Sequence, residues 1–323
     1  MNEAETAMAH PKPPAAAKKI LVIRLGALGD FILSFGPFAA IRAAHPDAQI
    51  TLLTTAPFAR LGRLSPWFDT VVIDRRRPWW DLRGFLDIRA KLRGYDFVYD
   101  LQTSGRSSRY FQLAGRPGWS GIARGCSHPH ANPERDHMHT WERQRDQLAM
   151  AGIDAVPVAE TGWLLAAAAP PEVPAPFALL VPGSSPHRPA KRWPTMLYGK
   201  LARELVKQGI TPVVIGTGPE GELARIIQDQ CPEAVDLTGQ TDLPGLAALA
   251  ARARFAVGND TGPMHLAAAM GCFCVTLFSY ASDFTRTQPR GPHGERYTVL
   301  REDNLADLPL DEVMAGLVAA ECL

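Results

Sequence analysis

The sequence lacks a hydrophobic run long enough to cross a membrane. Its longest uncharged, apolar stretch toward the carboxyl terminus is residues 266–278, which is 13 residues, whereas a spanning helix needs about 20. This stretch predicts a buried helix followed by a buried strand. Residues 1–17 contain three prolines and charged side chains but no apolar segment, so they predict a flexible tail rather than a signal peptide.

Cysteine is scarce, and neither sign of charge is in excess. The five cysteines are odd in number and contain no C-x-x-C pair, so a disulfide framework or a zinc ribbon is not indicated, and reduced, buried thiols in a cytoplasmic protein are expected. The chain has 34 basic and 33 acidic residues, so it lacks the basic excess of a nucleic-acid-binding protein. The two halves differ, with net charges of +5 for residues 1–160 and −4 for residues 161–323.

Short apolar runs alternate with helical segments along the chain, and its length of 323 residues favours two domains. Continuous apolar strands are typical of parallel sheets covered on both faces. The expected strands are residues 20–23, 50–53, 70–73, 97–101 and 118–122, then 177–181, 212–215, 234–237, 255–257 and 273–278. A proline- and alanine-rich linker at 161–176 would separate two doubly wound α/β domains, 18–160 and 177–323.

One glycine-rich loop matches a dinucleotide-binding fingerprint. Gly216, Gly218 and Gly221 form a G-x-G-x-x-G after an expected strand, and Asp236 follows 20 residues after Gly216. An NAD(P)-dependent oxidoreductase is therefore one candidate function. Against it, the loop follows the second strand of its domain, and Glu220 would repel a pyrophosphate. A turn that merely requires glycines accounts for the loop equally well.

Three other strand-end loops carry polar side chains that suit a ligand. Asp30 follows the first strand in Gly26-x-x-Gly29-Asp30, where spacing alone favours a helix-terminal carboxylate over a base. Around residue 260, a carboxylate, a hydroxyl and a histidine surround an expected helix start that could bind an anion; these residues are Asp260, Thr261, Gly262 and His265. The loop with Ser184, Ser185 and Lys191 could clamp a phosphate or could be a solvated basic loop.

Five blocks together resemble glycosyltransferase family 9, the ADP-heptose:lipopolysaccharide heptosyltransferases. They are ILVIRLGALGDFILSFGP (20–37), DFVYDLQ (96–102), LVPGSSPHRPAKRWP (180–194), VVIGTGPE (213–220) and FAVGNDTGPMHLAAAMG (255–271). The resemblance implies the GT-B fold, in which two Rossmann-like domains face a cleft, the first holding the acceptor and the second the nucleotide sugar. It further implies an inverting enzyme that needs no metal or other cofactor, and the sequence contains no Asp-x-Asp.

The resemblance also assigns roles to residues. It places the catalytic base on Asp30 and the diphosphate contacts on Lys191, on Ser184 and Ser185, and on the helix start at Thr261 and Gly262. Asp260 and His265 would lie in the same donor site, and Glu220 would hold the nucleotide ribose. Candidates on the acceptor side are Gly29, Arg60, Arg63, Gln102 and Arg106. A non-catalytic sugar-nucleotide-binding protein on the same fold remains a third possibility.

Two further segments are unusual. Residues 60–93 contain nine Lys or Arg against four Asp, with Trp67, Trp79, Trp80 and Phe85 among them. This is either a solvated face or a surface for an anionic glycolipid acceptor, which would bring the protein to the cytoplasmic face of the inner membrane. The second segment contains two H-x-H pairs, His128 and His130, then His137 and His139. An exposed polar loop is expected there rather than a metal site.

Overall fold

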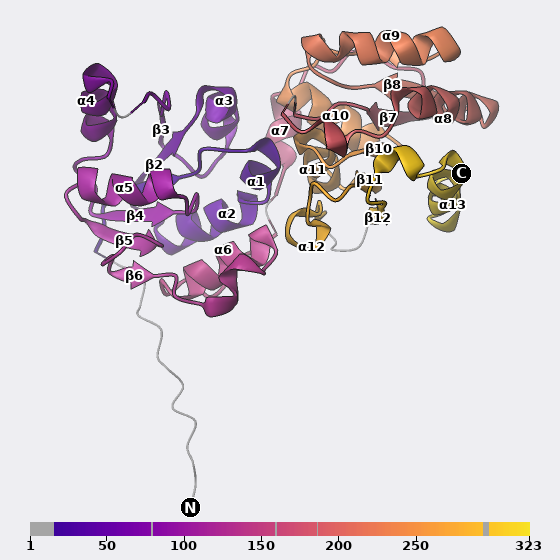
Figure 1. The fold of residues 1–323 in the computed structure, drawn as a ribbon. Coiled ribbons are helices and arrows are strands. Elements are labelled where there is room, and N and C mark those ends of the chain that lie inside the picture. The colour runs from indigo at the N-terminus through magenta and orange to yellow at the C-terminus, as the bar shows by residue number, and fades with distance from the viewer. Residues whose placement is uncertain (1–15, 79, 159, 186, 293–296) are drawn as a thin grey trace, which may run out of the picture. The chain divides into compact units, whose positions relative to one another are not determined.

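The structure is a computed structural model, and it describes residues 16–78, 80–158, 160–185, 187–292 and 297–323 (Figure 1). Residues 1–15 of the predicted tail, and Trp79, lie outside the described residues. The chain divides into two compact units. The first contains the described residues of Met1–Gly26 and Ser34–Ala159, and the second those of Ala27–Leu33 and Glu160–Leu323. The short segment that contains Asp30 therefore clusters with the second unit.

The first unit is a parallel six-stranded sheet with helices on both faces. Its strands are β1 (Lys19–Ile23), β2 (Gln49–Thr54), β3 (Thr70–Ile73), β4 (Phe97–Asp100), β5 (Gly118–Gly121) and β6 (His128–Pro129). Its helices are α2 (Phe35–Ala44), α3 (Ala56–Leu64), α4 (Leu82–Lys91), α5 (Gly105–Leu113), the 3₁₀ turn η1 (Pro133–Asp136) and α6 (Thr140–Ala149). The strand order β3-β2-β1-β4-β5-β6 is that of a doubly wound dinucleotide-binding sheet.

The second unit repeats this arrangement. Its strands are β7 (Phe177–Val181), β8 (Thr211–Val214), β9 (Val235–Asp236), β10 (Ala256–Asn259), β11 (Cys274–Phe278) and β12 (Tyr297–Arg301), in the order β12-β11-β10-β7-β8-β9. Its helices are α1 (Leu28–Ile32), α7 (Gly162–Ala166), α8 (Thr195–Lys207), α9 (Gly221–Gln230), α10 (Leu243–Arg252), α11 (Gly262–Ala269), α12 (Phe284–Thr287) and α13 (Leu310–Ala319). Three 3₁₀ turns are η2 (Pro189–Lys191), η3 (Gly218–Glu220) and η4 (Leu305–Asp307).

Burial explains why the strands are continuously apolar. All five residues of β7 and of β11 are buried, since helices cover both faces of each sheet (Figure 1). In the second unit α8, α9 and α13 pack together, and α10 packs on α11 and α7. The helix α7 lies within the segment predicted as a linker. All five cysteines are free and buried, as predicted.

The sequence predicted ten of the twelve described strands and missed one edge strand of each sheet. These are β6, which has only two residues, and β12, whose residues are mostly half-buried. Residues 266–278 fold, as predicted, into a helix and a strand, namely the second half of α11 and then β11. Among the described residues no helix combines the length and apolarity needed to span a bilayer.

Candidate active site

A pocket of about 420 Å³ in the second unit gathers four of the titratable residues selected from the sequence. Its lining includes Asp30, Lys191, Asp260 and His265, together with the amino-terminal residues of α11. We call it the Lys191 pocket. Its lining residues come from the segment around α1, from the segments that follow β7 and β10, and from α12. Residues as far apart in the sequence as Ala27 and Thr287 thus line one pocket, and doubly wound sheets bind ligands at the carboxyl ends of their strands.

Asp260 is the centre of this pocket. Its Oδ2 accepts hydrogen bonds from Lys191 Nζ at 2.5 Å and Ser282 Oγ at 2.7 Å. His265 Nε2 lies 3.9 Å from Oδ1, which is beyond hydrogen-bond distance. Burial alone would raise the pKa of Asp260, but the imidazole of His265 and the ammonium of Lys191 outweigh burial and lower this pKa to about 2. The carboxylate is therefore ionised and holds the lysine in place.

The backbone around Lys191 is fixed by a buried amide. Asn259 Oδ1 accepts from the backbone N–H of Trp193 and from the Tyr198 hydroxyl. Its Nδ2 donates to the carbonyls of Pro182 and Gly183. Trp193 is fully buried, and its indole donates to the carbonyl of Leu308. One side chain thus connects β10 to both ends of the loop that contains Lys191, and limits how far this loop can move.

The start of α11 is open to a ligand. Thr261 occupies the N-cap position, but its hydroxyl donates to the carbonyl of Asn259 and does not cap the helix. Close approach of α1 to this helix requires two glycines. A Cβ on Gly262 would lie 2.6 Å from Leu28 Cβ, and a Cβ on Gly29 would lie 2.5 Å from His265 Cδ2. Gly29 therefore lets α1, and Asp30 with it, reach the pocket.

Asp30 is half-buried in α1, and its Oδ2 accepts from the backbone N–H of Ala27 at 3.3 Å. The bond to Ala27 stabilises the start of α1, as the helix-terminal interpretation predicted. Asp30 also lines the Lys191 pocket. The two roles are compatible, since a carboxylate accepts several hydrogen bonds.

A second pocket adjoins the first and is more apolar. It has a volume of about 630 Å³ and shares Ser185, Thr261 and Gly262 with the Lys191 pocket. This volume is within the roughly 300–1,000 Å³ that is typical of small-molecule sites. Its walls include the apolar side chains of Leu28, Val181, Ile215, Leu243 and Leu246. We call it the apolar pocket.

Glu220 is the acidic side chain that the glycine-rich loop brings to the apolar pocket. Its Oε2 accepts from the backbone N–H of Thr217 at 2.7 Å and from the Thr217 hydroxyl at 2.9 Å. Its Oε1 lies 1.6 Å from where a Cβ on Gly183 would be. The glycine at 183 therefore makes room for this carboxylate, with one oxygen held and the other directed into the pocket region.

The two serines of the Lys191 loop differ in availability. Ser184 is buried, and its hydroxyl donates to the carbonyl of Arg188 and accepts from Arg192 Nε at 3.0 Å. Ser184 therefore helps to hold the loop together. Ser185 is exposed and lines both pockets, so its hydroxyl is the one available to a ligand.

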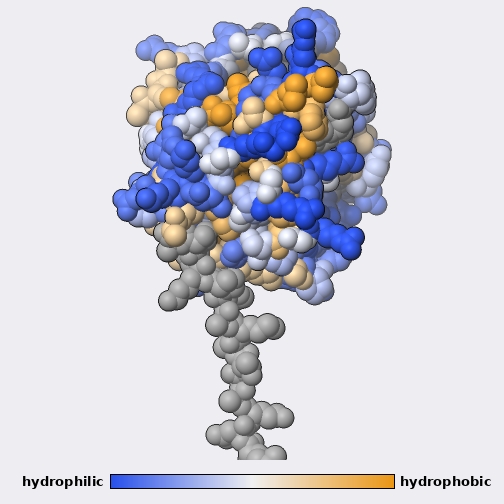
Figure 2. Space-filling view, turned by 90° about the vertical axis from the view of Figure 1, so that its left-hand side faces the viewer, coloured by the Kyte–Doolittle hydropathy of each residue, from blue (hydrophilic) through white to orange (hydrophobic). Residues whose placement is uncertain are grey.

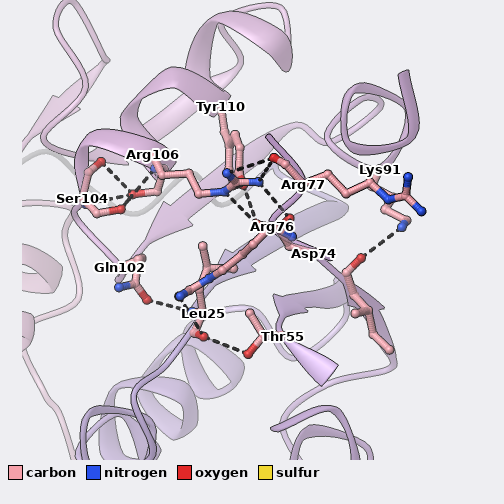
Figure 3. Close-up of polar contacts among 12 residues, drawn as sticks. Leu25, Thr55, Asp74, Arg76, Arg77, Lys91, Gln102, Ser104, Arg106 and Tyr110 are labelled. Carbon is pink, nitrogen blue, oxygen red and sulfur yellow. Dashed lines mark hydrogen bonds and ion pairs between the residues drawn. The ribbon is translucent and has the colours of Figure 1, made fainter. Parts of the chain in front are cut away.

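The acceptor-side candidates are divided between the two units. In the first unit, Arg106 donates to both carboxylate oxygens of Asp74, whose Oδ2 also accepts from the Tyr110 hydroxyl at 2.5 Å (Figure 3). Burial and the bond to Asp74 raise the pKa of Tyr110, so it stays protonated. Gln102 accepts from the backbone N–H of Leu25 nearby. Arg60 and Arg63 lie exposed on α3 and line neither pocket described above, whereas Gly29 lines the Lys191 pocket.

The expectation of an exposed histidine loop is wrong for two of its members. His130 is buried, and its Nε2 lies 2.8 Å from Asp146 Oδ2. His139 is also buried, and its Nδ1 accepts from the backbone N–H of Trp141 at the start of α6. These two histidines hold the fold together. Within the described ranges no cluster of His, Cys, Asp or Glu could hold a metal ion.

Sequence reasoning missed several residues of the site. Arg188 and Thr287 line the Lys191 pocket, and Ser282 bonds to Asp260. On the first unit, the Asp74–Tyr110 pair was missed, as was Arg76, whose guanidinium donates to the carbonyl of Leu25 (Figure 3). The position of Arg188 and of Ser282 in loops after strands was the available signal, because ligand-binding side chains concentrate there.

Comparison with known proteins gives a consistent result. A family model described as glycosyltransferase family 9 (heptosyltransferase) matches residues 86–312. Lipooligosaccharide heptosyltransferase 2 of Haemophilus ducreyi is 27% identical over 281 residues, which is 78% of this chain and 80% of that protein. Lipopolysaccharide heptosyltransferase 2 of Escherichia coli K12 is 37% identical over a shorter match of 103 residues, 30% of each chain.

Solved structures show the same fold. The Escherichia coli heptosyltransferase WaaC with ADP has a TM-score of 0.77 at 21% identity, and the match covers 94% of this chain and 99% of that one. The Escherichia coli ADP-heptose lipopolysaccharide heptosyltransferase II has a TM-score of 0.71 at 23% identity, covering 94% and 98%. The GT-B architecture of two doubly wound α/β units, expected from the sequence, is therefore confirmed.

Proposed function

The chain belongs to glycosyltransferase family 9, and from this premise we propose that it transfers a heptose from ADP-heptose to a lipopolysaccharide core acceptor, with inversion and without a metal ion. The observation that carries the proposal is the Lys191 pocket, where a carboxylate, a lysine, a histidine and an open helix start meet beside an apolar pocket. WaaC has been solved with ADP and with ADP-2-deoxy-2-fluoro heptose, which supports the choice of donor.

The donor would lie across both pockets. The adenine would pack in the apolar pocket against side chains such as Ile215 and Leu246. The free oxygen of Glu220 would accept hydrogen bonds from the ribose hydroxyls. The diphosphate would meet the start of α11, Ser185 and Lys191, because helix N–H groups and an ammonium both attract phosphate oxygens.

Transfer would be a single displacement. Asp30 would accept the proton of the attacking acceptor hydroxyl as its oxygen bonds to the anomeric carbon. The bond from that carbon to the diphosphate oxygen breaks at the same time, and ADP leaves. Negative charge grows on the departing diphosphate, where Lys191 and the α11 start would stabilise it. Attack opposite to the leaving group inverts the configuration of the anomeric carbon.

No metal ion is needed in this scheme. Lys191, His265 and the positive end of α11 would supply the potential that Mg²⁺ provides elsewhere. We expect transfer to continue at an unchanged rate in excess EDTA. Activity that disappears with EDTA and returns with Mg²⁺ or Mn²⁺ would contradict this part of the proposal.

The acceptor would be an anionic glycolipid held in a membrane. Arg76 and Arg106 at the strand ends of the first unit are suited to acidic sugars or phosphates, and a protein with net charge +1 is not suited to nucleic acid. We propose that the enzyme works at the cytoplasmic face of the inner membrane, as a peripheral protein. The acceptor domain would be residues 18–160 and the donor domain 177–323, joined by 161–176.

The test is a transfer assay with a heptose-deficient core glycolipid and a panel of nucleotide sugars. Product mass identifies the transferred sugar, and the anomeric coupling in the NMR spectrum reports inversion or retention. ADP-heptose should be the best donor. Binding of ADP-heptose without turnover on any acceptor would instead support a non-catalytic binding protein. The oxidoreductase alternative is disfavoured, because the Gly216 loop follows β8 rather than the first strand, β7, and Glu220 occupies its turn.

A further inference from the structure

Helix α4 in the first unit, and the turn before it, present large apolar side chains to solvent. Trp80, Leu82 and Leu86 are 87%, 69% and 52% exposed. They are three of the eight large hydrophobic side chains exposed in the described part of the chain, and they fall within seven residues. Leu82 and Leu86 are four residues apart and therefore share one face of the helix. Together with Arg83, Arg89 and Arg93 we call these residues the α4 patch.

Folding of the first unit does not account for this exposure. The opposite side of α4 packs inward through Ile88, and Leu92 after the helix is fully buried in the same core. The amino terminus of the helix is capped by Asp81, which accepts from the backbone N–H of Gly84. The helix is thus anchored without Leu82 and Leu86. A cluster of exposed apolar side chains with no role in packing indicates an interaction surface.

Among the described residues of this segment, the charges of the patch that are not held in ion pairs are all positive. The acidic side chains of this segment are already paired: Asp81 with Arg77 and Asp87 with Lys91. Arg83, Arg89 and Arg93 form no ion pair with any described residue. Figure 2 shows the face of the molecule on the α4 side, with apolar residues in its upper part bordered by hydrophilic ones. An apolar centre with a cationic rim matches the acyl boundary and the anionic headgroups of a bilayer.

We propose that the α4 patch docks on an anionic lipid bilayer. Trp80 and the two leucines would enter the interface between headgroups and acyl chains, where an indole is well accommodated, and the three arginines would contact phosphates. The choice of a membrane over another partner rests on the proposed function, since a lipid-held acceptor requires the enzyme to reach the bilayer. The inner side of α4 borders a small hollow lined by Arg77 and Arg106, so docking would bring the acceptor-side arginines close to the membrane surface.

The test compares the binding of the full chain to phosphatidylcholine vesicles with and without phosphatidylglycerol, by co-sedimentation. Leu82→Gln/Leu86→Gln should lower the partition coefficient about tenfold or more, from the apolar area lost. Arg83→Gln/Arg89→Gln/Arg93→Gln should lower it about a hundredfold on anionic vesicles, at about fivefold per arginine. High salt should remove the contribution of the three arginines to vesicle binding.

Matched control variants alter exposed residues of the second unit. Met196→Gln/Val318→Gln controls for loss of exposed apolar area, and Lys200→Gln/Arg203→Gln/Arg252→Gln controls for loss of charge. Neither should change vesicle binding. Circular dichroism of every variant should match the wild type, because all the altered side chains are exposed except that of Arg89, which is half-buried.

Activity separates this inference from the proposed function. Turnover on a short, lipid-free acceptor should be unchanged in both patch variants, while turnover on acceptor embedded in vesicles should fall with binding. If no acceptor is ever glycosylated but vesicle binding still depends on the patch, the docking surface stands and the proposed function fails. Vesicle binding that is absent in the wild type, or equal in patch and control variants, overturns the inference. A patch-dependent dimer without vesicle binding would show that the patch meets a second copy of the chain instead.

Discussion

Removing the cation of the Lys191–Asp260 pair should destabilise the protein more than removing both charges. The two side chains are only 13% and 7% exposed, and their charged atoms are 2.5 Å apart. Loss of one partner of a buried pair typically costs about 3–5 kcal/mol. Lys191→Met leaves Asp260 with Ser282 and with His265 nearby, so we expect a loss of about 2–3 kcal/mol in the free energy of unfolding, just below that range.

The double variant Lys191→Met/Asp260→Asn should recover most of this stability. It removes the stranded carboxylate, and an amide can still bond to Ser282. We expect its free energy of unfolding to lie within about 1 kcal/mol of the wild type, since replacing both partners is often nearly neutral. Urea unfolding followed by circular dichroism measures both values. Lys207→Met is the matched control, because Lys207 pairs with Glu204 on the exposed face of α8 and should cost at most about 0.5 kcal/mol.

Activity should not follow stability. If Lys191 stabilises the departing diphosphate, both the single and the double variant should lose about 10²–10³-fold in kcat/KM, with a loss of about tenfold in ADP affinity. Initial rates give kcat/KM, and calorimetric titration with ADP gives the ADP affinity. Recovery of transfer in the double variant would refute the reasoning, because Lys191 would then serve only to neutralise Asp260.

Three other substitutions test separate parts of the molecule. Asp30→Asn should lower kcat about 10²–10⁴-fold without weakening ADP, because it removes a negative charge from the pocket; near-normal turnover would exclude Asp30 as the base. Glu220→Gln should weaken ADP binding about fivefold, whereas Glu222→Gln should leave it unchanged. NAD should bind neither the wild type nor Glu220→Gln, and micromolar NAD binding to the wild type would support the oxidoreductase instead. Burial raises the pKa of Asp100 to about 7, so the contribution of this carboxyl to the free energy of unfolding should fall as pH rises from about 4 to 7. Urea unfolding of the wild type and of Asp100→Asn should therefore show a difference in free energy that changes over this range, and a difference independent of pH would contradict the shift.

The sheets could be predicted from the sequence because their strands are buried on both faces. A run such as β7, with five buried residues in succession, has no polar alternation and stands out between helical segments. The missed strands lack this signal. The residues of β12 are mostly half-buried and mix polar with apolar types, and β6 is too short to form a run. The position of a strand at the edge of its sheet, rather than a weak β-propensity of its residues, is what limits the prediction of strands.

The location of the site could also be predicted, since polar residues after parallel strands meet at one edge of the sheet. Its internal contacts could not. Ser282 bonds to Asp260 from a loop 22 residues further on, and no spacing rule connects the two. Ser184 and Ser185 are neighbours of the same type, yet one hydroxyl is used by the loop and the other is exposed. Such differences arise from the path of the loop backbone, which the residue types alone do not determine.

The glycine at position 29 shows how a residue selected from the sequence can have a different physical basis in the structure. The G-x-x-G-D pattern suggests a tight turn in which a ligand approaches the backbone. In the structure Gly29 lies within α1, where a Cβ would collide with the imidazole of His265. Only a small residue fits at position 29, because two helices meet there. This close contact places Asp30 in the pocket with Lys191 and Asp260. The close contact between α1 and α11 at Gly29 thus places the base proposed for the acceptor next to the groups proposed to bind the donor. A change at residue 29 would therefore disturb both halves of the reaction through packing alone.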